Sequence, residues 1–99
     1  MNIHITLQEV CSSTGLSRAA VVQIVEHGIV EPQGDAPEQW LFDDQCLGLV
    51  QRARRLQQDL ELNWPGIALV IELLEQRDRL LAENEALQRR LQRFDSHQA

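Results

Sequence analysis

The chain has 99 residues and a formal net charge of −6 at pH 7, because 15 acidic residues outnumber nine basic ones, all of them arginines. This length provides one modest domain. Proteins that bind nucleic acid usually carry a basic face that neutralises phosphates. The acidic balance therefore argues against DNA and favours a basic protein partner.

The two cysteines, Cys11 and Cys46, have no CxxC motif and no histidine at metal-ligand spacing. We interpret both as small buried residues of a protein in a reducing compartment. Residues 1–4 lack the basic segment and the apolar run of a signal peptide, and no segment reaches the roughly twenty apolar residues of a membrane span. The sequence therefore predicts a cytoplasmic protein without a membrane segment.

The chain begins with a short alternating segment. Ile3, Ile5 and Leu7 alternate with polar residues, which predicts a strand that enters the fold. Thr6 and Glu9 have the spacing of a capping box, in which each residue's side chain accepts a hydrogen bond from the other's backbone N–H. This pair predicts the start of a first helix.

A helix-turn-helix is predicted next. Gly15 permits the left-handed backbone of a tight turn, and Ser17 can cap a second helix that runs from about Arg18 to His27. Gly28 ends this helix as a C-terminal glycine. Two short helices around such a turn form the motif.

A small wing and a third helix follow. Ile29–Val30 and Trp40–Phe42, separated by the polar loop 31–39, predict two strands of the wing. Asp43 or Asp44 can cap the third helix. The apolar side of this helix is predicted to contain Leu47, Leu49, Val50, Ala53, Leu56 and Leu60.

The last third of the chain predicts one long helix over 63–94, with Asn63 as its cap and Pro65 in its first turn. Its heptad seam of a and d positions is typical of a helix that pairs with another chain, and we predict a homodimer. The seam consists of Val70, Leu73, Arg77, Leu80, Asn84, Leu87, Leu91 and Phe94. Leu74 and Leu81 widen the stripe, so that one side can pack on the preceding domain while the other meets a second copy.

The predicted fold class is mainly α, a winged helix-turn-helix with a small β wing and a long C-terminal helix. We divide the chain into the winged domain 1–62, the long helix 63–94 for dimerisation and partner binding, and a disordered tail 95–99.

Catalysis has little support in the sequence. The histidines His4, His27 and His97 are scattered without a motif that would supply a serine or cysteine partner, and there is no glycine-rich phosphate loop. The adjacent carboxylates of Asp43 and Asp44 suit acid–base chemistry, but acids at a helix N-terminus are explained by the helix dipole. We predict no enzymatic activity, no cofactor and no metal site.

The predicted second helix is poorly equipped to read DNA. In a helix-turn-helix this element presents polar and basic side chains to base edges. Here the candidates are Arg18, Gln23, Glu26 and His27. Up to Phe42 the chain holds five acidic residues against Arg18 alone, so phosphates would be repelled. We expect this helix to have kept its packing role and lost its DNA chemistry.

Other charged residues allow two interpretations. Arg52, Arg54 and Arg55 either contact nucleic acid or an acidic partner, or form a solvated face on which Arg55 pairs with Asp59. The acids of the long helix are either ordinary solvated residues or a row that steers a basic helix towards this surface. These acids are Glu72, Glu75, Asp78, Glu83 and Glu85.

The large aromatic residues Trp40, Phe42 and Trp64 also allow two interpretations. In the first, they fill the joints between the wing, the third helix and the long helix. In the second, one of them anchors a partner, because aromatic side chains are enriched at interface centres.

Several segments carry a family resemblance. Thr6–Cys11, Thr14–Ser17 and Gly28–Pro32 resemble the N-terminal domain of MerR-like regulators. A narrower resemblance, to the chaperone modulator family CbpM, rests on Val30–Pro32, Trp40–Asp44, Gln51–Leu56, Leu62–Ala68 and Glu83–Asn84. DNA-binding MerR-like proteins typically have a pattern like Arg-Tyr-Tyr-Glu where this chain has Gln23–Glu26, which agrees with the charge balance.

The CbpM resemblance implies a cytoplasmic bacterial regulator that binds the J-domain of a DnaJ-like co-chaperone, CbpA. It implies inhibition of the co-chaperone's stimulation of the Hsp70 partner DnaK, and of its association with DNA. J-domains engage Hsp70 through a basic helix beside a His-Pro-Asp loop, and acidic side chains can compete for that helix. Our hypothetical contact residues are Trp40, Asp43, Asp44 and Trp64 in one group, and Glu72, Glu75 and Asp78 in another.

Two alternatives remain at this point. The first is a MerR-like transcription regulator that presents two winged domains to DNA. The second is a scaffold that only dimerises. The direction of the predicted dimer is also open, because Asn84 at an a position favours a parallel pair whereas MerR-like proteins commonly pair antiparallel.

Overall fold

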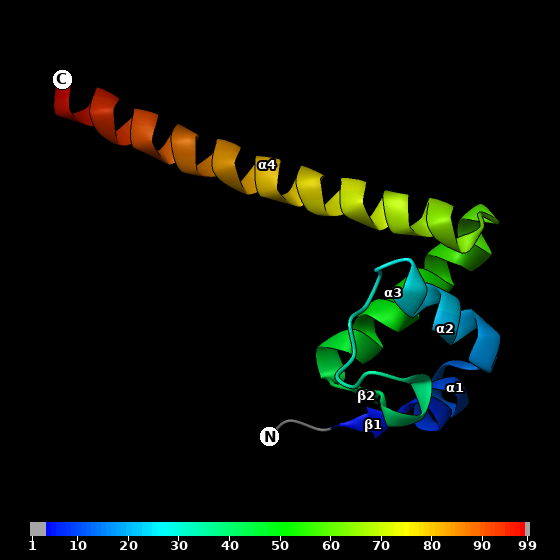
Figure 1. Ribbon diagram of the computed structural model, residues 1–99. Coiled ribbons are helices and arrows are strands. Elements are labelled where there is room, and N and C mark those ends of the chain that lie inside the picture. Colours follow the sequence, from blue (N-terminus) through cyan, green and yellow to red (C-terminus); the bar gives the residue numbers. More distant parts are fainter. Residues whose placement is uncertain (1–3, 99) are drawn as a thin grey trace.

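The computed structural model describes residues 4–98, with side chains up to residue 95, and shows a small helical domain from which one long helix extends (Figure 1). The described elements in chain order are β1 (Ile5–Thr6), α1 (Leu7–Thr14), α2 (Arg18–Glu26), the 3-10 helix η1 (Pro37–Gln39), β2 (Leu41–Phe42), α3 (Asp44–Leu60) and α4 (Trp64–Gln98). This mainly α architecture with a small sheet confirms the predicted fold class.

The first helix starts at the predicted capping box. The backbone N–H of Glu9 donates to Thr6 Oγ1 at 3.2 Å, and the N–H of Thr6 donates to Glu9 Oε1 at 3.2 Å. The predicted strand is present at Ile5 but ends before Leu7, which is the first residue of α1 and is buried. Ile3 lies outside the described residues.

The turn between α1 and α2 also has the predicted chemistry. Gly15 adopts a φ of 77°, and its N–H donates to the carbonyl oxygen of Cys11 at 2.9 Å. Ser17 Oγ accepts a hydrogen bond from the N–H of Ala20 at 3.1 Å and caps α2. The helix-turn-helix is therefore confirmed, with α2 ending at Glu26 and Gly28 in a left-handed conformation.

The predicted wing is partly wrong. Ile29 and Val30 form no strand, because the N–H of Ile29 donates to the carbonyl of Ile24 and both side chains are buried. Successive side chains of a strand would point to opposite faces. Instead, β2 pairs antiparallel with β1, with Phe42 opposite Ile5. Within the segment predicted as the wing, Gln33 and Leu41 form an isolated antiparallel β-bridge.

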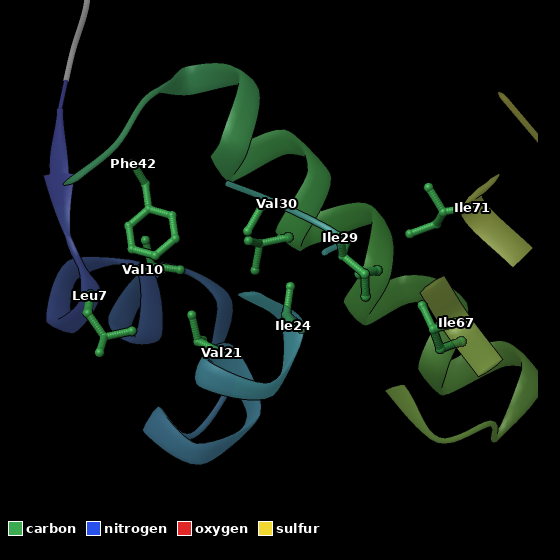
Figure 2. Close-up of a cluster of buried hydrophobic side chains, with 11 residues drawn as sticks. Leu7, Val10, Val21, Ile24, Ile29, Val30, Phe42, Ile67 and Ile71 are labelled. Carbon is green, nitrogen blue, oxygen red and sulfur yellow. The ribbon is translucent and has the colours of Figure 1, made fainter. Parts of the chain in front are cut away.

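The hydrophobic core joins the two strands and the four α-helices (Figure 2). Phe42 is fully buried and meets Trp40 edge-on, with ring centroids 6.2 Å apart. Trp40 and Trp64 are half-buried and pack against the core, so the aromatic residues fill joints between elements. Of the residues predicted on the apolar side of α3, Val50 and Ala53 are buried, whereas Leu60 is exposed.

Side-chain caps define the starts of α3 and α4. Asp43 Oδ1 accepts a hydrogen bond from the N–H of Cys46 at 2.8 Å, and Asn63 Oδ1 accepts one from the N–H of Gly66 at 2.9 Å. The α4 helix continues beyond its predicted end at Phe94 to Gln98. Of the predicted tail, residue 99 lies outside the described part of the chain.

The two cysteines are half-buried, free thiols that pack against the core. No described helix combines the length and apolar content that a membrane crossing needs.

Candidate partner-binding site

The α4 helix has two apolar faces with different surroundings. Ile67 and Ile71 are buried in the core, and Trp64 and Ala68 pack beside them. Beyond these residues the helix leaves the domain, and its C-terminal part makes no contact with the other elements in Figure 1. Ile67 and Ile71 were not predicted to hold α4 on the core, although their i,i+4 spacing after Pro65 places them on one face of the helix.

The predicted seam lies on the exposed side of α4. Its apolar residues beyond Val70 are between 54% and 64% exposed: Leu73, Leu80, Leu87, Leu91 and Phe94. Val70 is half-buried, and the two polar seam residues Arg77 and Asn84 are exposed. Of the residues that widen the stripe, Leu74 is half-buried and Leu81 is exposed. The helix therefore presents an apolar stripe, interrupted by Arg77 and Asn84, that its own domain leaves uncovered.

A cleft of about 380 Å³ lies where the end of α2 meets the start of α4. It is lined by His27, Gly28, Ile29, Pro65, Ala68, Leu69, Ile71, Glu72 and Glu75. In the described part of the chain, neither Glu72 nor Glu75 takes part in an ion pair. The turn after α2 and the first turns of α4 thus form a cleft with two free carboxylates. We call it the α2–α4 cleft.

The structure separates the predicted contact residues. Trp40, Asp43 and Asp44 lie around β2 and the start of α3, whereas Trp64 follows the other end of that helix. A 17-residue helix spans about 25 Å at 1.5 Å per residue. Trp64 therefore lies far from the two aspartates with which it was grouped. Trp64 instead shares α4 with the second predicted group, Glu72, Glu75 and Asp78, of which the first two line the cleft.

The Asp43 carboxylate already serves as the N-cap of α3. The hydrogen bond from the Cys46 N–H holds the pKa of the Asp43 carboxyl below its usual value, because the donor stabilises the ionised form. Burial raises the pKa of the Cys46 thiol, which packs against the same turn. Asp44 is exposed in the first turn of α3, where an acid favours the helix dipole.

The side chains expected to face DNA are all exposed: Arg18, Gln23, Glu26 and His27. The guanidinium of Arg18 is paired with Glu38 at 3.2 Å, so its charge is partly compensated. Arg52 and Arg54 are half-buried, and Arg55 is exposed. Among the described residues the ion pairs are Arg18–Glu38 and Arg77–Asp78, so the pair expected between Arg55 and Asp59 does not form.

Within the described residues, His, Cys, Asp and Glu side chains form no group of three or more that could hold a metal ion. The surface features of the described residues are an acidic cleft, an apolar stripe and the exposed face of α2.

Known proteins are similar to this chain in sequence. Residues 5–89 match the family described as MerR HTH family regulatory protein. The chain is 48% identical over 92 residues to the chaperone modulatory protein CbpM of Pseudomonas putida (strain W619), covering 93% of this chain and 91% of that protein. Over 97 residues it is 45% identical to CbpM of Citrobacter koseri and 43% identical to CbpM of Salmonella paratyphi B, covering 98% of this chain and 96% of each relative. With its MerR-like helix-turn-helix, the chain belongs to the CbpM family of chaperone modulatory proteins.

Proposed function

We propose that the chain binds the J-domain of a DnaJ-like co-chaperone, CbpA, and so inhibits the co-chaperone's stimulation of DnaK and its association with DNA. Family membership supports a role in chaperone modulation, because the relatives carry the name chaperone modulatory protein. The net charge of −6 supports a basic partner such as the basic helix of a J-domain.

The observation that carries the proposal is the pair of exposed, unpaired carboxylates of Glu72 and Glu75 at the α2–α4 cleft. Residues three apart on a helix lie on one face, so both side chains can meet one partner helix. Charge-assisted hydrogen bonds from arginine or lysine to such carboxylates are stronger than neutral ones. Of the two predicted groups, we therefore favour the acids of α4 over Trp40, Asp43 and Asp44.

Inhibition follows from competition in this mechanism. A J-domain whose basic helix is covered by the acidic start of α4 has no free surface for DnaK. Binding requires no chemistry and no cofactor, only a preformed acidic surface on a rigid helix. Opposite charges also speed the encounter, so association should be fast and sensitive to salt.

The test is the ATPase rate of DnaK with full-length CbpA and increasing amounts of the chain. We expect the stimulated rate to fall towards the rate of DnaK alone. Reversing two charges together, Glu75→Arg with Asp78→Arg, should shift the half-inhibitory concentration upward by about tenfold or more. The matched control is Glu83→Arg with Glu85→Arg, further along the same helix, which should change it little.

An unchanged ATPase rate at saturating concentrations of the chain would contradict the proposal. If the chain instead bound random duplex DNA with a steep salt dependence, the transcription regulator would be the better account. Binding to neither CbpA nor DNA would leave only the dimeric scaffold.

A further inference from the structure

The α2–α4 cleft has one acidic wall. Glu72 and Glu75 lie one turn apart, and like charges at this spacing repel each other. In the described part of the chain Asp78 is paired with Arg77 at 3.2 Å, whereas the two cleft glutamates have no such partner. Arg79 follows Glu75 by one turn but forms no ion pair with it. A cation from outside the chain would relieve the repulsion between the two glutamates.

The opposite wall adds to the negative potential. It consists of His27, Gly28 and Ile29, the turn that directly follows the C-terminus of α2. The C-terminal end of a helix carries a partial negative charge from its last carbonyl groups. Glu26, the last residue of α2, is exposed beside this turn. Both sides of the cleft therefore favour a cation.

The remaining lining is apolar. Leu69 is 55% exposed, Pro65 is also exposed, and Ala68 is half-buried between them. Arginine and lysine have a long apolar stem below a charged head, and such side chains lay the stem along apolar surface while the head reaches a polar group. Leu69 and Ala68 fit the stem, and Glu72 and Glu75 fit the head.

We infer that the α2–α4 cleft receives one arginine or lysine side chain from the basic helix of the J-domain, with its stem against Ala68 and Leu69 and its charge between Glu72 and Glu75. This inference rests on the proposed function and specifies its contact. The cleft volume of about 380 Å³ is ample for one long side chain. A second copy of the chain is the expected occupant of the exposed Leu73–Phe94 stripe instead.

The test compares two isosteric double variants of the full chain. Glu72→Gln with Glu75→Gln removes the two cleft charges, and Glu83→Gln with Glu85→Gln removes two charges of the same helix outside the cleft. Affinity for full-length CbpA is measured by calorimetric titration at low and raised salt. We expect the cleft variant to lose at least about tenfold in affinity and the control to lose less than about twofold.

A double-mutant cycle then identifies the inserted residue. Each basic residue of the J-domain helix is changed to alanine and titrated against the wild-type chain and the cleft variant. One position should weaken binding to the wild-type chain and have little further effect on the cleft variant, because the two changes remove the same contact.

Equal losses in the cleft and control variants would overturn the cleft inference and leave only general electrostatic attraction. Wild-type affinity in the cleft variant, or additive effects at every basic position, would also overturn it while leaving the proposed function intact. If the wild-type chain does not bind CbpA at all, the proposed function and the cleft inference both fail.

Discussion

Asp43 shows how a residue with two interpretations is resolved by its contacts. It was predicted as a helix cap and also as a partner contact. Its carboxylate accepts the Cys46 N–H at 2.8 Å, a bond that a partner's cation would have to share. The glutamates of the cleft have no comparable partner in the described residues, so they are the freer ligands. Their positions, unlike that of Asp43, are not needed to start a helix.

The cap at Asp43 predicts a pH dependence of stability. The folded-state pKa of Asp43 lies below its ordinary value of 3.8, so the stabilisation is fully present above that value and is lost as the pH falls through the lower folded-state pKa. Asp43→Ala should lower the thermal unfolding midpoint at pH 7, and the difference from wild type should shrink below pH 3.8. The measurement is circular dichroism melting at equal protein concentrations across this pH range.

The matched control for the cap is Asp43→Asn. Asparagine is also a good N-cap but does not titrate, so its melting midpoint should stay close to wild type at pH 7 without the acidic step. A constant difference between wild type and Asp43→Ala down to the lowest pH would show that the carboxylate charge does not contribute.

At the scale of elements, α4 packs on the core with one face and exposes a second apolar face to solvent. Ile67 and Ile71 fix its start to the core, while the exposed stripe from Leu73 to Phe94 runs along the side that the domain does not cover. Exposed leucines in this number are costly in water and are typical of a surface that pairs. We propose that a second copy covers them.

The seam position of Arg77 favours an antiparallel pair. A parallel pair in register would place Arg77 against Arg77. An antiparallel pair that uses the whole seam, with position 70 opposite position 94, places Arg77 of each copy opposite Leu87 of the other. We expect this to outweigh the parallel preference of a single Asn84.

Disulfide cross-linking tests the direction of the pair. Chains with Val70→Cys and chains with Phe94→Cys, both with the native cysteines replaced by alanine, are mixed and oxidised. The antiparallel register places position 70 of one copy opposite position 94 of the other, so the mixed disulfide should dominate when the cross-linked dimers are identified by intact mass spectrometry. Disulfides formed mainly between two copies of the Val70→Cys chain would indicate a parallel pair instead.

For the whole molecule, short sequence patterns predicted the helices and their caps. Contacts between residues that are far apart in the sequence were not predicted. The capping box at Thr6 and the cap at Asn63 were predictable because each bond joins residues three apart. The second strand of the wing was predicted correctly, but its pairing with Ile29–Val30 was wrong: β2 pairs with β1, and nothing near Phe42 in the sequence indicates Ile5 as its partner. The acids of α4 were predicted as contacts, but the α2 turn that faces them is brought there only by tertiary packing.

The overall shape explains how one chain can serve two partners. The molecule measures 63 × 35 × 21 Å, and α4 runs along most of its length (Figure 1). The cleft is at the end of α4 that packs on the domain, and most of the stripe lies beyond it along the exposed helix. The proposed pairing of two copies and the proposed binding of the co-chaperone would therefore use separate surfaces.

The central claim is that a MerR-like scaffold here binds a basic protein surface and not DNA. Its most direct test is a fluorescence anisotropy titration of the full chain against three labelled ligands: CbpA, CbpA lacking its J-domain, and a random DNA duplex. We predict saturable binding to CbpA alone, weakened by raised salt. Tight, salt-dependent binding to the duplex with no difference between the two forms of CbpA would contradict this account.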